Sequence, residues 1–205
     1  MSQEFTELER SLGYSFSNKR NLRRALTCQS AINEWHSNAS EQNFKVFEFL
    51  GDAALKYSVA TMLYFARNDI KSSGDYHEKT LPYINNTNLT RIGRELNLQR
   101  YIITGQGVTI TDKMLGDAVE AILGAIIIDQ RQQGNSAENV CFDVVSRLFS
   151  ISRKTFLLSS PNITQKQNSA CCPCCQCCCS FCGGFIFAIV LMIILVVIGY
   201  FLDFF

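Results

Sequence analysis

Hydrophobic residues recur at intervals of three and four over most of the first 151 positions, as expected for one face of an α-helix. This spacing predicts two short helices within residues 5–27 and longer ones at 41–66, 78–98, 112–130 and 137–151. Polar connections are predicted at 27–40, 68–76 and 97–111. Pro82 is expected to kink its helix or to start a new one. Strand-like alternation is nearly absent, so we predict an all-α body that ends near residue 151.

The remainder of the chain differs in composition from this body. Residues 152–170 are polar, include Pro161 and show no periodicity, which predicts a flexible linker. Cysteines then crowd the next segment, and a long apolar run follows it. The predicted parts are a folded body at 1–151, a linker at 152–170, a cysteine-rich segment at 171–182 and a transmembrane segment at 183–205.

The apolar run extends without interruption from Phe185 to Leu202. At about 1.5 Å per residue it nearly crosses a hydrocarbon core of roughly 30 Å, and the flanking residues complete the span. Because only three residues follow the run, we expect a single-pass tail anchor with the body facing the cytosol. Lys166 before the run and Asp203 after it agree with the positive-inside rule. The alternative is a buried core helix, which seldom runs this long without a polar face.

Eight of the ten cysteines lie in the segment CCPCCQCCCSFC, beside the predicted span. Only Cys28 and Cys141 lie in the body, so we expect a reducing compartment rather than a disulfide scaffold. Cysteines next to a membrane are candidates for palmitoylation. These candidates are Cys171, Cys172, Cys174, Cys175, Cys177, Cys178, Cys179 and Cys182. Metal binding, which needs separated cysteine pairs, and low-complexity drift are the alternatives.

Composition narrows the candidate chemistry. The net charge of +1 gives no overall attraction to nucleic acid or to a membrane surface, although local patches can still bind. The first residues, MSQEFTELERSLGYSF, do not resemble a signal or transit peptide. His36 and His77 are too few and too far apart for a histidine-based site. The candidate chemistry therefore rests on carboxylates.

Two acidic pairs stand on predicted apolar helices. Glu48 and Asp52 are four residues apart, and Asp117 and Glu120 are three apart, so each pair lies on one face of its helix. Four carboxylates in apolar surroundings are costly unless a cation lies between them. Oxygen ligands without nearby histidine or cysteine favour Mg²⁺ or Mn²⁺ over Zn²⁺. The alternative is that each pair forms an ordinary solvated helix face.

The sequence around these acids resembles the catalytic domain of the ribonuclease III family. The run FEFLGDAAL at 47–55 is similar to the family's first acidic helix, and KMLGDAVEAILGAIIID at 113–129 is similar to its second metal-binding helix. LGYSFSNKRNLRRALT at 12–27 and INNTNLTRIGRELNLQRYI at 84–102 resemble its N-terminal and middle helices. The four blocks occur in the family's order and cover about residues 5–150.

The resemblance implies an activity, a cofactor and a site. Glu48, Asp52, Asp117 and Glu120 occupy the family's metal-binding positions, with Asp52 and Glu120 as catalytic residues. The implied reaction is Mg²⁺-dependent hydrolysis of double-stranded RNA that leaves 5′-phosphate ends, and Mn²⁺ is expected to substitute. The resemblance also implies a homodimer in which Phe49 contacts the partner subunit; the alternative for Phe49 is an ordinary core residue.

The chain departs from the family pattern at several points. Lys45 stands where the family usually carries an acid, within expected reach of Glu48 and Asp52, where its charge can lower their pKa values, compete with the metal or meet a phosphate. Ser73 and the segment 78–82 also differ from the family pattern. The linker, cysteines and apolar run occupy the place of a separate double-stranded-RNA-binding domain.

These departures leave other functions open. One is a catalytically weak or inactive module that binds RNA or dimerises at a membrane. Another is an unrelated helical scaffold whose acids face water. The favoured hypothesis is a membrane-tethered endoribonuclease.

Overall fold

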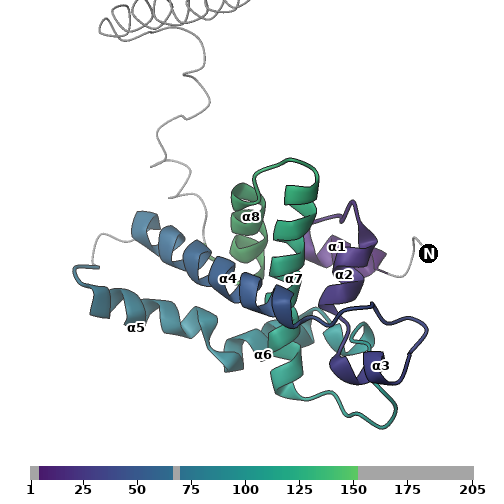
Figure 1. Ribbon diagram of the computed structural model, residues 1–205. Helices are drawn as coiled ribbons and strands as arrows, with labels where there is room; N and C mark the ends of the chain where they lie inside the picture. Colours follow the sequence, from purple (N-terminus) through teal and green to yellow (C-terminus); the bar gives the residue numbers. More distant parts are fainter. Residues whose placement is uncertain (1–4, 67–69, 152–205) are drawn as a thin grey trace, which may run out of the picture. The chain divides into compact units, whose positions relative to one another are not determined.

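The computed structural model describes residues 5–66 and 70–151, and this part of the chain is helical (Figure 1). Its elements are α1 (Thr6–Leu12), α2 (Lys19–Ala25), α3 (Gln29–Asn33), α4 (Lys45–Ala66), α5 (Ser73–Ile84), α6 (Asn86–Glu95), the 3₁₀ turn η1 (Leu98–Arg100), α7 (Asp112–Gln132) and α8 (Glu138–Leu148). An isolated bridge between Thr27 and Ile103 is the sole β pairing among the described residues. The predicted all-α class is confirmed for these residues.

Helix α7 lies at the centre of the packing. It contacts α2, α4, α6 and α8. Its buried apolar side chains point in several directions, which is typical of a helix enclosed by others. They are Leu115, Ala118, Val119, Ala121, Ile122, Leu123, Ala125 and Ile126. Helix α4 contributes Phe47, Leu55 and Val59 to the same core, so the two helices that carry the acidic pairs form its main contact.

Two glycines allow α4 and α7 to cross closely. A Cβ atom at Gly51 would lie 1.7 Å from the carbonyl oxygen of Glu120. A Cβ atom at Gly124 would lie 2.0 Å from the carbonyl oxygen of Phe47. No side chain fits at either distance, so backbone meets backbone at this crossing. It brings the first turns of α4 beside the first half of α7.

Several predicted boundaries are wrong by a few residues. Helix α4 starts at Lys45 rather than at 41, and α3 lies in a segment that was predicted to be a loop. Helix α5 starts at Ser73 because Ser72 and Asp75 form a capping box. Pro82 therefore lies inside α5, and the next helix begins instead after Asn85.

A buried carboxylate ties the N-terminal helices to α7. Asp129 is 1% exposed and accepts hydrogen bonds from the Tyr14 hydroxyl at 2.6 Å and from Asn21 at 3.0 Å. The backbone amides of Ser17 and Asn18 also donate to it, each at 2.9 Å. Although burial alone would raise the pKa of Asp129, these hydrogen bonds hold it below its usual value. The sequence pattern did not indicate this network.

Within residues 5–66 and 70–151, no helix combines the length and the apolarity needed to cross a membrane. The predicted linker at 152–170, the palmitoylation candidates at 171–182 and the anchor at 183–205 lie outside the described residues. Cys28 and Cys141 are buried free thiols, and burial raises the pKa of each to about 11. Both thiols are therefore protonated at neutral pH.

Candidate metal centre

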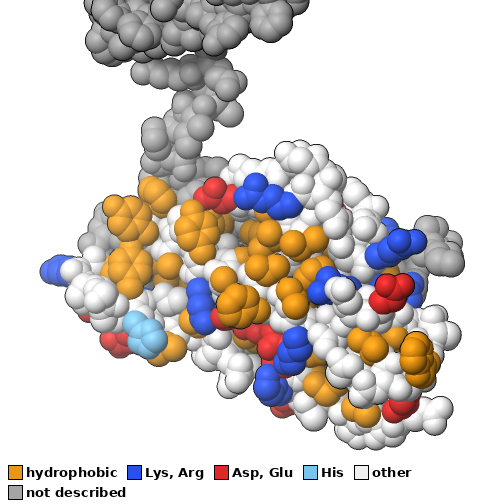
Figure 2. Space-filling model, viewed as in Figure 1, with side chains coloured by type: hydrophobic (Ala, Val, Ile, Leu, Met, Phe, Trp, Pro, Cys, Tyr) orange, Lys and Arg blue, Asp and Glu red, His pale blue; other side chains and the backbone are white. Residues whose placement is uncertain are grey.

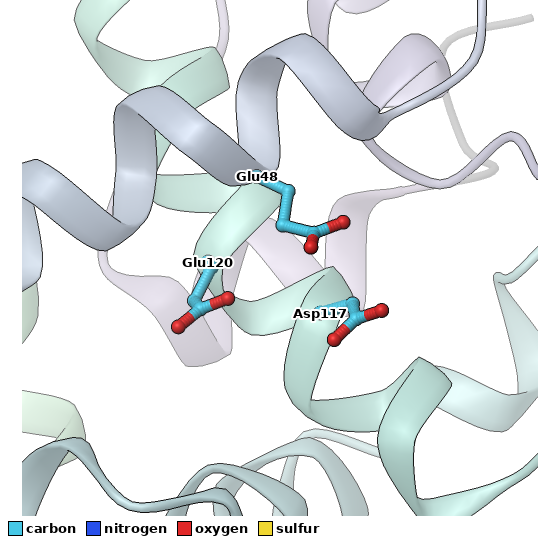
Figure 3. A group of neighbouring side chains, drawn as sticks. All are labelled: Glu48, Asp117 and Glu120. Atoms are coloured by element: carbon cyan, nitrogen blue, oxygen red, sulfur yellow. The ribbon is translucent and has the colours of Figure 1, made fainter.

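Three of the four predicted carboxylates converge at the crossing of α4 and α7. Glu48 comes from the first turn of α4, and Asp117 and Glu120 come from one face of α7. Each offers an oxygen, and these three oxygens lie within 4.8 Å of one another (Figure 3). Figure 3 shows the three carboxyl groups around a common space, contributed by segments about 70 residues apart in the chain.

Asp52, the fourth predicted ligand, lies beside this group but is not part of it. Its carboxylate accepts a hydrogen bond from Lys56 Nζ at 2.7 Å, one turn along α4. It remains close enough to raise the pKa of Glu120 through its charge. The structure thus brings together Glu48, Asp117 and Glu120 and leaves Asp52 at the edge of the group.

Two lysines contact the converging carboxylates. Lys45 Nζ lies 2.7 Å from Glu48 Oε2 and 3.2 Å from Asp117 Oδ2. Lys113 Nζ lies 2.7 Å from both oxygens of Asp117. Lys45 therefore reaches Glu48 and Asp117, rather than the expected Glu48 and Asp52. In Figure 2 the acidic side chains on this face are bordered by Lys and Arg side chains and by a broad hydrophobic area.

Of the four carboxylates, Glu120 is the one whose negative charge is not balanced by an ion pair with a described lysine or arginine. Among the described residues, its carboxyl group forms neither an ion pair nor a hydrogen bond. Burial raises the pKa of Glu120 to about 7, and the charges of Asp52, Glu48 and Asp117 add to the increase. Near neutral pH this carboxyl group is therefore close to half protonated when no metal is bound. An added cation would favour its charged form.

The donor set fits a hard divalent cation. Oxygen atoms alone converge, and they come from side chains that are partly or largely buried and held by their own helices. Such sets suit Mg²⁺ and Mn²⁺. Burial chiefly sets the raised pKa of the Cys28 thiol, and the charges of Lys45 and Asp117 also act on it. This thiol is not among the converging ligands.

Two neighbours of the site were not predicted from the sequence. The first is the contact of Lys113 with Asp117, although their spacing of four residues on a helix was a visible signal. The second is the proximity of Cys28 to the site, which no local pattern indicates because the residue lies in a different part of the sequence.

A known protein family matches the part of the chain that carries this site. The family described as Ribonuclease III domain matches residues 45–131, which run from the start of α4 nearly to the end of α7. Glu48, Asp117 and Glu120 all lie inside this match. This part of the chain is similar to the ribonuclease III family.

Individual relatives show the same similarity. The chain is 37% identical over 135 residues to Ribonuclease 3 of Methylococcus capsulatus, covering 63% of this chain and 55% of that protein. It is 34% identical over 132 residues to Ribonuclease 3 of Francisella philomiragia, covering 63% and 54%. The chain thus spans about half the length of the curated relatives that it matches.

Two crystal structures of the ribonuclease III nuclease domain from Campylobacter jejuni share the fold. One has a TM-score of 0.58 at 29% identity and covers 72% of this chain and 99% of that one. The other has a TM-score of 0.57 at 28% identity and covers 73% and 97%. The first of these structures is described as showing flexibility in a region involved in dimer formation of that domain.

The surface of α4 beside the site is apolar. Phe49 is 76% exposed, which excludes the alternative that it is a core residue of the single subunit. Further exposed apolar side chains on α4 are Val46, Tyr57 and Tyr64. Figure 2 shows hydrophobic side chains gathered across the face along which α4 runs in Figure 1. Scattered exposed apolar residues are ordinary, but several on one helix are typical of an interaction surface.

Proposed function

We propose that this protein is an endoribonuclease that hydrolyses phosphodiester bonds in double-stranded RNA and leaves 5′-phosphate ends. The observation that carries the proposal is the convergence of Glu48, Asp117 and Glu120 within a ribonuclease III domain. Three carboxylates at this spacing form a site suited to Mg²⁺, with Mn²⁺ as a substitute. The names of the relatives support the same reaction class.

Each residue has a distinct role in this proposal. Glu48, Asp117 and Glu120 would hold the divalent ion. When bound, that ion supplies a water nucleophile of lowered pKa and neutralises charge on the leaving oxygen. Because burial raises the pKa of Glu120 to about 7 in the metal-free protein, metal binding near neutral pH would release a proton from this carboxyl group. Asp52, held by Lys56 at the edge of the group, is the second proposed catalytic carboxylate.

We further propose that two copies of the chain form a homodimer through the exposed apolar surface of α4. Phe49 is the most exposed apolar side chain of that helix and would be the central contact. A twofold interface uses the same surface of both subunits, so each Phe49 would meet a pocket or an apolar patch on the other copy. The dimer would place two metal centres on one RNA cleft.

Membrane tethering remains part of the proposal. The apolar run from Phe185 to Leu202 would anchor the protein, with the ribonuclease domain in the cytosol and the cysteines at 171–182 available for palmitoylation. A tether raises the effective concentration of a weak dimer. Deletion of residues 171–205 should move the protein from the membrane pellet to the supernatant after cell fractionation. Membrane association that persists in the deletion variant would contradict the anchor.

The reaction is tested by incubating the full chain with a long RNA duplex, in Mg²⁺ or in EDTA. Glu120→Gln should lower the cleavage rate by at least about 10²-fold, because it removes a charged ligand of the metal ion. Glu95→Gln is the matched control, since Glu95 is exposed and pairs only with Arg91 on its own helix. Equal rates for wild type and Glu120→Gln would refute the nuclease assignment.

A specific observation favours a second candidate, a module that binds the duplex but cleaves it poorly. Lys45 contacts two of the three converging carboxylates and so occupies contacts that a metal ion would need. Duplex binding without turnover at high Mg²⁺ and high Mn²⁺ would support this candidate. Turnover that rises with metal concentration would exclude it.

A further inference from the structure

Lys45 joins the two helices of the site through one ammonium group. The ammonium group contacts carboxylates from two different helices, Glu48 on α4 and Asp117 on α7. By contrast, pairing with a single acidic residue is seen for Lys19, Lys56, Arg91, Arg94 and Lys113. Lys45 thus lies between ligands from α4 and α7, the same two helices between which a bound dication would lie.

Further contacts hold the Lys45 side chain in this position. Its ammonium nitrogen lies 4.8 Å from the centre of the Phe44 ring, within the range of a cation–π interaction. Its backbone amide donates a hydrogen bond to Asn43 Oδ1 at 3.0 Å, which fixes the start of α4. The side chain is nonetheless 55% exposed, so the ammonium group has space to turn into solvent.

The charges of the site already come close to balance without a metal. The carboxylates are Glu48, Asp52, Asp117 and Glu120, and the ammonium groups that contact them belong to Lys45, Lys56 and Lys113. When all are ionised, a single negative charge is left over. A dication added to this arrangement would reverse the sign of the site. These three ammonium groups therefore weaken the attraction of the site for a metal ion.

We propose that Lys45 is a built-in counter-ion that competes with the divalent metal for Glu48 and Asp117. This inference rests on the proposed function, because it concerns the same metal centre. Lys45 is a positioning residue: it holds the two carboxylates together in the metal-free protein and makes the site bind metal less tightly than its carboxylates alone would allow. Among the described carboxylates, Lys113 contacts Asp117 alone, so it competes for one ligand rather than two.

The test is the affinity of the full chain for Mn²⁺ alone, measured by calorimetry or from the EPR signal of free Mn²⁺. Lys45→Met should lower the Mn²⁺ dissociation constant by about tenfold, since it removes two partly exposed ion pairs that the metal must break. Lys45→Arg keeps the positive charge and should stay within about twofold of wild type. Both substitutions lie on an exposed side chain, and thermal melts establish that the variants are folded.

Lys56→Met is the matched control. Lys56 lies on the same helix, is 54% exposed and pairs at 2.7 Å with Asp52, which is outside the converging group. We expect its removal to tighten Mn²⁺ binding by no more than about threefold, through long-range charge alone. An equal effect of Lys56→Met and Lys45→Met would overturn the specific role of Lys45.

The remaining outcomes separate this inference from the proposed function. One outcome is that Mn²⁺ binds to wild type, that Glu120→Gln abolishes this binding and that Lys45→Met leaves it unchanged. The metal centre would then be supported, and the role of Lys45 would be refuted. If neither wild type nor Lys45→Met binds Mn²⁺ at millimolar concentration, both the inference and the metal-dependent function fail. Binding by Lys45→Met but not by wild type would support the inference.

Discussion

Removing the charge of Glu120 should stabilise the metal-free protein while impairing its function. Glu120→Gln keeps nearly the same shape and deletes one negative charge from a group of four carboxylates. The wild-type carboxyl group is partly buried, forms no ion pair within the described residues and faces the charges of Asp52, Glu48 and Asp117. A neutral amide at this position avoids that repulsion.

The magnitude follows from the pKa of Glu120, which rises from an ordinary 4.5 to about 7 in the folded chain. This difference corresponds to about 3 kcal/mol at most, and solvent screening of a partly exposed group reduces it to about 2 kcal/mol. Because the folded state binds the Glu120 proton more tightly than the unfolded state does, protonation of Glu120 adds to the free energy of unfolding. This contribution is fully present below pH 4.5. It is lost as the pH rises through about 7.

The amide in Glu120→Gln does not titrate, so the two proteins should diverge over this pH range. In EDTA the variant should be about as stable as wild type at pH 4.5 and about 2 kcal/mol more stable at pH 8. For a domain of this size, that difference raises the melting temperature by roughly 5 °C. Urea unfolding and thermal melts at several pH values measure it, with Glu95→Gln as the control for an exposed, paired carboxylate.

A difference in the free energy of unfolding between Glu120→Gln and wild type that does not change with pH would refute the reasoning. So would a variant that is less stable than wild type at pH 8. The metal supplies a second check, because a ligand that binds only the folded state stabilises it. Added Mn²⁺ should raise the melting temperature of wild type and have little effect on Glu120→Gln.

Three further predictions concern packing and assembly. Gly51→Ala should cost about 3 kcal/mol in urea unfolding, because the added methyl group forces α4 away from α7; wild-type stability would contradict the close crossing. Asp129→Ala should cost about 3 kcal/mol in the same assay, because the Tyr14 hydroxyl and two backbone amides lose their acceptor; a loss below about 1 kcal/mol would contradict the importance of this network. Phe49→Asp should give monomers in sedimentation velocity while the melting temperature of the monomer is retained; a dimer that persists would exclude this contact.

Local sequence determined most of the helices and the candidate acids. The periodicity of three and four residues indicates which face of α4 is buried, because a few neighbouring side chains suffice to define an amphipathic helix. The spacing of Glu48 from Asp52 and of Asp117 from Glu120 places each pair on one face for the same reason. The boundaries were less certain, as the capping box at Ser72 shows, since a single side-chain hydrogen bond decides where a helix starts.

Only the tertiary structure decided which charged groups from different helices meet. Lys45 crosses to Asp117 on another helix, while Asp52 pairs with Lys56 on its own. The close crossing at Gly51 makes this choice, because it sets the distance between side chains that lie about 70 residues apart in the chain. A sequence pattern specifies which side chains share a helix face, but the electrostatic energy of a site depends on distances between elements. Those distances are fixed by packing.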